Sequence, residues 1–178
     1  QEADPNNLAP TASTTAQAAM GDALATALLA VRGFSPKDFA RFHPGGALGK
    51  QLYLRVRDLY VRNEKPMVQP HADIRQAILE MTTKRLGCTV VVAADHSVKG
   101  IITDGDLRRM LEKHQQLENL QAEQIMTQRP KTVQAGEMAV VALDLMRSNS
   151  ITQLIVVDEQ DKYLGIIHLH DLLREGLI

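Results

Sequence analysis

The chain has 178 residues, of which 44% are hydrophobic and 23% charged, so it has room for one medium or two small globular domains. Its formal net charge of −1 argues against a nucleic-acid-binding protein, and no apolar run approaches the length of a membrane span. The single cysteine, Cys88, excludes a disulfide framework and favours a reducing cytoplasm.

The N-terminal third predicts two helices. It opens on Gln1 with neither an initiator methionine nor a signal peptide, as expected for a fragment of a longer protein. Hydroxyl side chains at 13–15 are predicted to cap a long alanine-rich helix that ends at Gly33. A second helix is predicted after Ser35 as N-cap, and the HPGG stretch that starts at His43 ends it. Two helices cannot form a complete core, so this third is predicted to be the end of another domain.

The rest of the chain predicts the order strand, helix, strand, strand, helix twice. Apolar residues recur at helical spacing in 74–81 and 141–146, and β-branched runs at 90–92 and 154–157 predict buried strands. In each copy a further strand runs directly into a short helix. These closing helices are predicted at Leu107–Lys113 and Leu172–Glu175. Residues 121–130 predict a linker helix between the copies, and residues 55–61 take the matching place before the first copy.

The two runs are copies of one sequence. Residues 68–109 align without gaps with residues 133–174, at a constant separation of 65 residues. Identical pairs include Val68/Val133, Ala77/Ala142, Met81/Met146, Val91/Val156, Gly100/Gly165, Asp106/Asp171 and Arg109/Arg174. A register that holds this long indicates an internal duplication, and two copies suit a pseudo-two-fold pair.

The repeated corner, GIITDGDL in the first copy and GIIHLHDL in the second, resembles the cystathionine-β-synthase (CBS) domain pair. The resemblance covers residues 55–178. The first copy keeps the family's pattern as Thr103 and Asp106, whereas the second has His168 in the threonine position and keeps Asp171. With one residue of slip, Tyr60 stands where the second copy has Met126.

The resemblance implies a nucleotide site at these corners. A helix N-terminus attracts phosphate, a threonine hydroxyl can reach a ligand oxygen, and the family's aspartate accepts hydrogen bonds from a ribose. Arg109 and His168 are further candidates, as partners for acidic groups. The alternative is that Thr103 and Asp106 only cap their own helix. The exchange of threonine for histidine predicts two clefts that are not equivalent.

A metal site is not predicted. His168 and His170 alternate on the expected strand and would face the same side, but no further Cys or His pair accompanies them. Cys88 is predicted to be a small buried residue.

A second, narrower resemblance covers residues 2–50 and continues through the CBS part. The segments LAPTASTT, MGDALA and HPGGALG resemble the end of the sugar isomerase (SIS) domain of D-arabinose 5-phosphate isomerases. These enzymes join an SIS domain to a C-terminal CBS pair and convert D-ribulose 5-phosphate to D-arabinose 5-phosphate for Kdo and lipopolysaccharide synthesis. The resemblance implies catalytic roles for His43 and Glu2 in the full-length enzyme. The alternatives are a loop histidine and a solvated terminal glutamate.

The expected fold is α/β (α+β), a tandem CBS pair with pseudo-two-fold symmetry preceded by the helical remnant of an SIS domain. The expected boundaries are 1–52, 53–115 and 116–178. The expected protein is the C-terminal part of a cytoplasmic isomerase and is inactive alone. It needs no cofactor and forms a homodimer of CBS pairs, or a homotetramer at full length. CMP-Kdo is expected as regulatory ligand ahead of AMP or ATP. A CBS module that only senses or assembles, and a related isomerase of a hexitol operon, are the alternatives.

Overall fold

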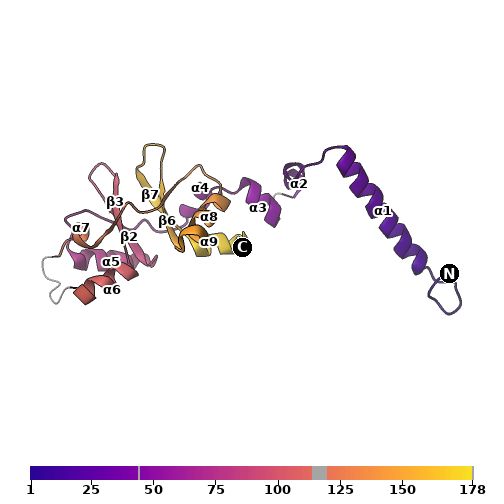
Figure 1. Cartoon of the computed structure of the whole chain (residues 1–178), viewed down its shortest axis with the longest axis horizontal. Helices are drawn as coiled ribbons and strands as arrows, with labels where there is room; N and C mark the ends of the chain where they lie inside the picture. The colour runs from indigo at the N-terminus through magenta and orange to yellow at the C-terminus, as the bar shows by residue number, and fades with distance from the viewer. Residues whose placement is uncertain (44, 114–119, 178) are drawn as a thin grey trace. The chain divides into compact units, whose positions relative to one another are not determined.

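The computed structural model describes residues 1–43, 45–113 and 120–177 (Figure 1). The chain forms two compact units, Gln1–Pro44 and Gly45–Ile178. The expected boundary between residues 115 and 116 falls outside the described residues, and the three expected domain ranges stay a prediction. No helix of the described residues is long and apolar enough to cross a membrane.

The first unit contains the two helices α1 (Ala12–Val31) and α2 (Pro36–Phe42). The predicted capping role of residues 13–15 is wrong, because α1 begins at Ala12 and these residues already lie in its first turn. The carboxylate of Glu2 takes the capping role instead. The helix ends as predicted, with Gly33 at a φ of +62° two residues beyond it. Ser35 caps α2 as predicted, in a capping box with Asp38.

The second unit contains both sequence copies. Its elements are α3 (Ala47–Tyr53), α4 (Val56–Tyr60), β1 (Met67–Val68), α5 (Ile74–Lys84), β2 (Cys88–Val92), β3 (Val98–Thr103), α6 (Asp104–Lys113), α7 (Ala122–Ile125), β4 (Thr127–Gln128), β5 (Thr132–Gln134), α8 (Ala139–Asn149), β6 (Gln153–Val157), β7 (Tyr163–His168) and α9 (Leu169–Arg174). The predicted order of strands and helices is confirmed in each copy.

Each copy builds its own small sheet. The sheet orders are β1-β2-β3-β4 and β5-β6-β7. In each, the first pair of strands is parallel and the next pair, a hairpin, is antiparallel. Figure 1 shows α5 and α6 against the first sheet and α8 and α9 against the second.

Three predicted helix bounds need correction. The helices α6 and α9 begin at Asp104 and Leu169, three residues earlier than predicted, because the last residue of each preceding strand caps them directly. The predicted linker helix is limited to Ala122–Ile125. The residues that follow it pair with β3, Thr127 opposite Ile101, and so extend the first sheet.

The duplication is also visible in the backbone. The helices α5 and α8 both end at a residue in the left-handed region, Arg85 with a φ of +56° and Ser150 with a φ of +52°. An isolated bridge joins Ser97 to Lys162, which are equivalent residues of the two copies. A contact between equivalent residues is the mark of a pseudo-two-fold axis, which confirms the predicted symmetry.

The short helix before each copy packs into the core of the other copy. Val56 and Leu59 of α4 are buried in the cluster formed by the second copy, and Ala122 of α7 is buried in that of the first. A Cβ atom built on Gly165 would lie 2.8 Å from the Tyr60 ring, and one on Gly100 would lie 2.5 Å from the sulfur of Met126. The predicted equivalence of Tyr60 and Met126 is therefore confirmed.

A third apolar cluster joins the two sheets. It consists of Cys88, Val90, Val92, Ile155, Val157, Tyr163 and Ile166. The Tyr163 hydroxyl donates to the carbonyl of Pro66 across the copies at 2.9 Å. Burial, with a smaller contribution from Asp104, raises the pKa of the Cys88 thiol to about 12, so Cys88 is the buried residue that the sequence predicted.

Candidate functional site

The corner between β3 and α6 is a capping box. The Asp106 N–H donates to Thr103 Oγ1 at 3.3 Å, and the Thr103 N–H donates to Asp106 Oδ2 at 2.8 Å. The Thr103 hydroxyl also donates to Asp106 Oδ2 at 2.6 Å. This reciprocal pairing lets the strand pass into the helix without a loop. The capping alternative for Thr103 and Asp106 is thus present in the structure.

The other oxygen of the Asp106 carboxylate has two further donors. Thr127 of β4 donates its hydroxyl to Oδ1 at 2.8 Å, and Arg109 donates its Nη2 at 2.6 Å. Asp106 is only 5% exposed. Burial acts to raise its pKa, but the hydrogen bonds from Thr103, Thr127 and Arg109 outweigh it and hold the pKa below its usual value.

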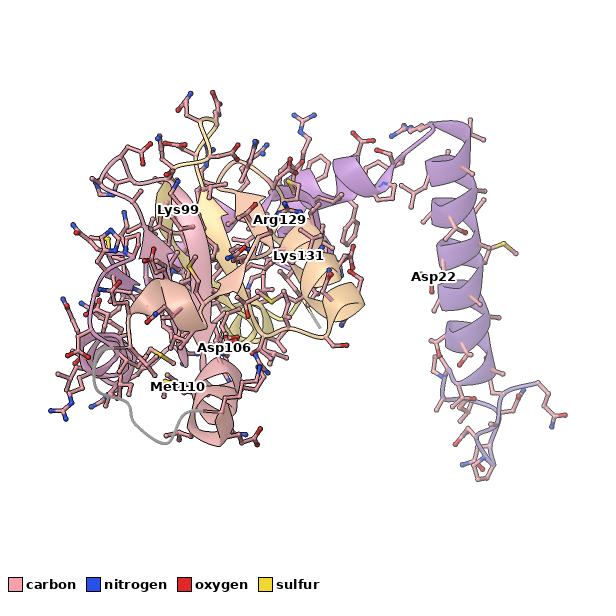
Figure 2. The ribbon with its side chains drawn as sticks, turned by 60° about the vertical axis from the view of Figure 1, so that its left-hand side comes forward. Asp22, Lys99, Asp106, Met110, Arg129 and Lys131 are labelled. Atoms are coloured by element: carbon pink, nitrogen blue, oxygen red, sulfur yellow. The ribbon has the colours of Figure 1, made fainter. Side chains whose placement is uncertain are left out.

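Asp106 lies in the wall of a cavity of about 320 Å³, named here the first cleft. Its lining residues are Ile101, Thr103, Asp106, Arg109, Thr127, Arg129, Pro130, Lys131, Ile151 and Gln153. The last two belong to the second copy, so both copies build the cleft. Figure 2 labels Arg129 and Lys131, which come from the segment between β4 and β5. Apolar walls with a few converging polar groups are typical of a small-molecule site.

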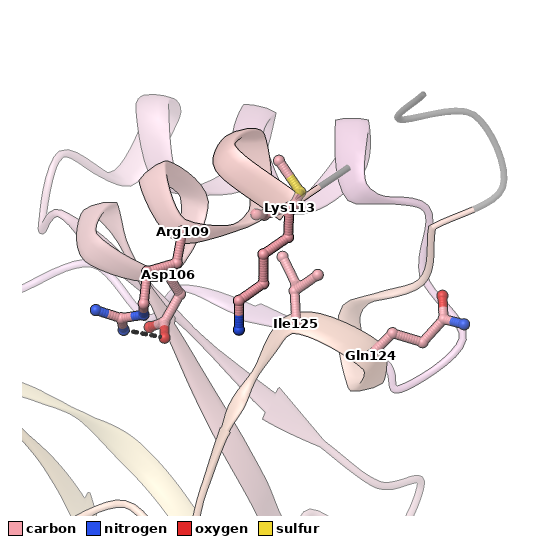
Figure 3. A pocket seen from close by; sticks show the side chains of 6 residues that line it. Asp106, Arg109, Lys113, Gln124 and Ile125 are labelled. Carbon is pink, nitrogen blue, oxygen red and sulfur yellow. Dashed lines mark hydrogen bonds and ion pairs between the residues drawn. The ribbon is translucent and has the colours of Figure 1, made fainter. Parts of the chain in front are cut away.

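A smaller cavity of about 110 Å³ lies between α6 and α7. It shares Asp106 and Arg109 with the first cleft and is otherwise lined by Met110, Lys113, Gln124 and Ile125. Figure 3 shows the ion pair between Arg109 and Asp106, with Lys113 reaching from the same helix. The ion pair therefore belongs to the wall that separates two hollow regions.

The corner between β7 and α9 is also a capping box, but with a histidine in the threonine position. The His168 N–H donates to Asp171 Oδ2 at 2.8 Å, and the His170 N–H donates to His168 Nδ1 at 3.1 Å. His168 is therefore the helix cap in place of a threonine. The prediction that His168 and His170 lie on one strand is wrong, because His170 already belongs to α9, although the two rings stack at 4.8 Å. Asn63 also donates to Asp171 Oδ2, at 2.6 Å.

These residues line a second cleft of about 160 Å³. It is lined by Asn63, Arg85, Leu86, His168, His170, Asp171 and Arg174. Burial lowers the pKa of His168, and the neighbouring His170 and Arg174 act in the same direction, while Asp171 opposes them. No group of three or more His, Cys, Asp or Glu within the described residues is arranged to hold a metal ion.

The structure thus gathers the five predicted ligand residues into two sites. Thr103, Asp106 and Arg109 line the first cleft, and His168 and Asp171 line the second. The other residues that line the two clefts were not predicted, among them the polar residues Arg129, Lys131, Asn63 and Arg85. The signal for Arg129 and Lys131 is their position on either side of Pro130, a proline that by itself predicts only the end of a linker helix.

The two predicted catalytic residues lie at opposite ends of α1 within the first unit. His43 is exposed, follows α2 and stacks its ring on Phe39 at 4.5 Å. Glu2 accepts hydrogen bonds from Thr11 N–H at 2.7 Å and Ser13 N–H at 3.2 Å at the start of the helix. Twenty residues of helix span roughly 30 Å, so the chain does not bring Glu2 and His43 together.

Glu2 is a helix cap in this arrangement. Hydrogen bonds from the Ser13 hydroxyl, the Thr11 N–H and the Ser13 N–H lower its pKa to about 2. A general base works best with a pKa near the operating pH. The capped carboxylate is therefore a weak base, and the catalytic role of Glu2 stays a prediction.

Two copies of a strand, helix, strand, strand, helix unit, related by a pseudo-two-fold axis and with a cleft at each strand-to-helix corner, define a CBS domain pair. The sequence matches the CBS domain over residues 56–113 and 122–177, and the chain belongs to this family. It is similar to a CBS domain protein from Pyrobaculum aerophilum complexed with AMP, with a TM-score of 0.61 and 25% identity, over 67% of this chain and 90% of that one.

Curated relatives match the chain more closely. The arabinose 5-phosphate isomerase KdsD of Salmonella typhi is 50% identical over 179 residues, which covers 100% of this chain and 54% of the relative. The KdsD of Escherichia coli K12 is 49% identical with the same coverage. The chain therefore spans about half the length of the curated relatives it matches, and it corresponds to their C-terminal part.

Proposed function

We propose that this chain is the regulatory CBS-pair part of an arabinose 5-phosphate isomerase, preceded by the end of its SIS domain. The observation that carries the proposal is the 50% identity to the Salmonella typhi enzyme over 100% of the chain. A bare CBS pair would explain only the residues matched to that family, 56–113 and 122–177, and would leave the first unit without a counterpart. The activity belongs to the whole enzyme, and the chain alone is inactive.

In the whole enzyme the reaction is the interconversion of D-ribulose 5-phosphate and D-arabinose 5-phosphate in the cytoplasm. Such an isomerisation moves a proton between adjacent carbons through an enediol, and this requires a base. His43 is the residue of this chain best suited to that role, because its ring is exposed and only stacked on Phe39. A related isomerase of a hexitol operon would use the same chemistry. Expression of the gene separates the two assignments, because induction by a hexitol would favour the hexitol operon and expression without one would favour lipopolysaccharide synthesis.

The first cleft is proposed to bind an anionic nucleotide. It offers a carboxylate for a ribose, apolar walls for a base, and Arg129 and Lys131 for phosphate or carboxylate groups. The AMP complex of the Pyrobaculum protein supports an adenine nucleotide. CMP-Kdo, which combines a nucleotide with a carboxylate, is the alternative ligand if the site senses a downstream product of the pathway.

Calorimetric titration of the chain with AMP, ATP, CMP and CMP-Kdo tests this proposal. At least one of the four should bind with a Kd below about 1 mM. Asp106→Asn should weaken that ligand about tenfold or more, because a hydrogen bond to a charged group contributes about 1.5–3 kcal/mol. Asp171→Asn, the matched change in the second copy, should have a smaller effect on the first cleft. If none of the four binds, the CBS pair has no nucleotide-sensing role, and assembly becomes its proposed function.

We further propose that two CBS pairs associate through the outer faces of α5 and α8. The sequence predicts Ile74, Ile78, Val141 and Leu145 for this surface, but Ile74 is fully buried within the chain and does not belong to it. Leu79 is 66% exposed and Val141 is 38% exposed, and both are apolar enough to form part of an interface.

The chain should therefore form at least a dimer, with two-fold symmetry. Sedimentation at micromolar concentration should detect this association. Leu79→Glu should shift the population toward monomer, because it places a charge on the proposed contact. Leu111→Glu is the matched control, since Leu111 is 60% exposed on a different helix, α6. A monomer in the unaltered chain would contradict the proposed association.

A further inference from the structure

The carboxylate that the proposed nucleotide site needs is fully occupied by the protein itself. Asp106 accepts two hydrogen bonds on each oxygen, from the Thr103 N–H and hydroxyl, the Thr127 hydroxyl and Arg109. A carboxylate has about four lone-pair positions. A ribose hydroxyl can therefore bind Asp106 only if one of these donors leaves. This inference rests on the proposed nucleotide-binding role.

Arg109 is the donor that can leave most readily. The Thr103 donors form the cap of α6, and Thr127 is fixed in β4 beside β3. The Arg109 side chain, by contrast, is 59% exposed and attached through a long flexible stem. The exposed guanidinium can exchange this contact for water, whereas the backbone of the α6 cap and of β4 holds the Thr103 and Thr127 donors in place.

The second copy lacks this arrangement. Arg174 occupies the equivalent position, yet no ion pair between Arg174 and Asp171 is present among the described residues. Asp171 accepts from His168 and Asn63 through Oδ2. The contact of Arg109 with Asp106 is therefore a property of the first cleft and not of the repeated fold.

The first cleft also holds an excess of positive charge. Among the described residues that line it, Asp106 is the only carboxylate and Arg109 pairs with it, so Arg129 and Lys131 face no second carboxylate in this lining. The Arg109 guanidinium donates one hydrogen bond to Asp106. A phosphate or carboxylate of a ligand is a stronger partner, because the guanidinium can bind such a group in a bidentate manner.

We propose that Arg109 is a specificity-determining residue. Arg109 occupies Asp106, the ribose acceptor, until an anionic group of the ligand binds the guanidinium in place of Asp106. Release of Arg109 frees Asp106 Oδ1 for a ribose hydroxyl, and the released guanidinium holds the phosphate or carboxylate. An uncharged nucleoside has no anionic group that could bind Arg109 in place of Asp106. The first cleft consequently selects anionic nucleotides over nucleosides that present the same base and ribose.

Calorimetric titration with AMP and adenosine, and in parallel with CMP and cytidine, tests this selection. All titrations use the Asp171→Asn variant, in which the second cleft lacks its carboxylate, so that binding to the first cleft is measured. The chain should bind the nucleotide about thirtyfold or more tightly than its nucleoside. Arg109→Gln should weaken the nucleotide about tenfold and strengthen the nucleoside about threefold, so that the preference almost disappears.

Two matched variants separate this role from an ordinary phosphate contact. Arg129→Gln should weaken the nucleotide without strengthening the nucleoside, because Arg129 does not occupy Asp106. Arg108→Gln, at an exposed residue of α6 that lines neither cleft, should leave both affinities within about twofold. If the nucleotide binds but Arg109→Gln does not strengthen the nucleoside, the proposed role of Arg109 is wrong and the nucleotide site stands. If no nucleotide or nucleoside binds any variant, both proposals fail.

Discussion

Replacing His43 with alanine in a full-length isomerase that carries this sequence should lower kcat by at least about a hundredfold, the low end for a lost general base. The side chain is exposed at the end of α2, and its ring stacks on Phe39 with centroids 4.5 Å apart. This stacking orients the ring while leaving it accessible to a substrate. The full-length enzyme can be assembled by joining the chain to the N-terminal part of the Escherichia coli relative.

The measurement is the steady-state rate of conversion of D-arabinose 5-phosphate by the joined enzyme, with the chain alone as a reference that should show no turnover. His96→Ala is the matched control, because His96 is an exposed histidine on the hairpin between β2 and β3. It should leave kcat unchanged. A His43→Ala enzyme with a rate near that of the unaltered enzyme would remove His43 from the catalytic assignment.

Glu2, the second residue predicted to be catalytic, caps a helix in the structure, whereas His43 is exposed. Glu2 was assigned by resemblance, but its carboxylate accepts the first N–H groups of α1, which a helix N-terminus leaves without partners. The Thr11 hydroxyl also donates to the same oxygen, at 3.0 Å. Sequence alone did not predict this contact, because residues 3–10 between Glu2 and Thr11 must fold back for it to form.

The sequence predicted those features that depend on local chemistry. The capping residue Ser35, the end of α1 before Gly33, and the order of elements in each copy all follow from short-range patterns and from a repeat that stays in register. The symmetry of the pair followed from the same repeat, because equivalent residues such as Ser97 and Lys162 can then meet across an axis.

The sequence did not predict which copy each short helix serves. Residues 55–61 precede the first copy, yet Val56 and Leu59 are buried in the core of the second. The residues around a short helix do not show which of the two cores will bury it, since both cores have an apolar face next to a strand glycine. The positions of Arg129 and Lys131 were missed for a related reason, because their relation to Asp106 depends on β4 pairing with β3.

Replacing Asp106 with alanine should destabilise the second unit by about 2–4 kcal/mol, whereas Asp171→Ala should cost only about 1 kcal/mol. The two residues are equivalent in the repeat but not in their contacts. Asp106 is 5% exposed and accepts four hydrogen bonds, and its removal leaves the Thr127 hydroxyl and the Thr103 N–H without their acceptor. Asp171 is half-buried, and it accepts hydrogen bonds from the His168 N–H and from Asn63.

Urea unfolding of the two variants and the unaltered chain, followed at the same protein concentration, measures this difference. The pKa of Asp106 is lowered in the folded chain, so its ionised form stabilises the fold above its usual pKa of 3.8. That contribution should be lost as the pH falls through the lower pKa of the folded state. The gap between the unaltered chain and Asp106→Ala should therefore be widest near neutral pH and narrow in acid. Equal destabilisation by the two alanine variants would show that the contacts of Asp106 contribute no more than those of its partner in the repeat.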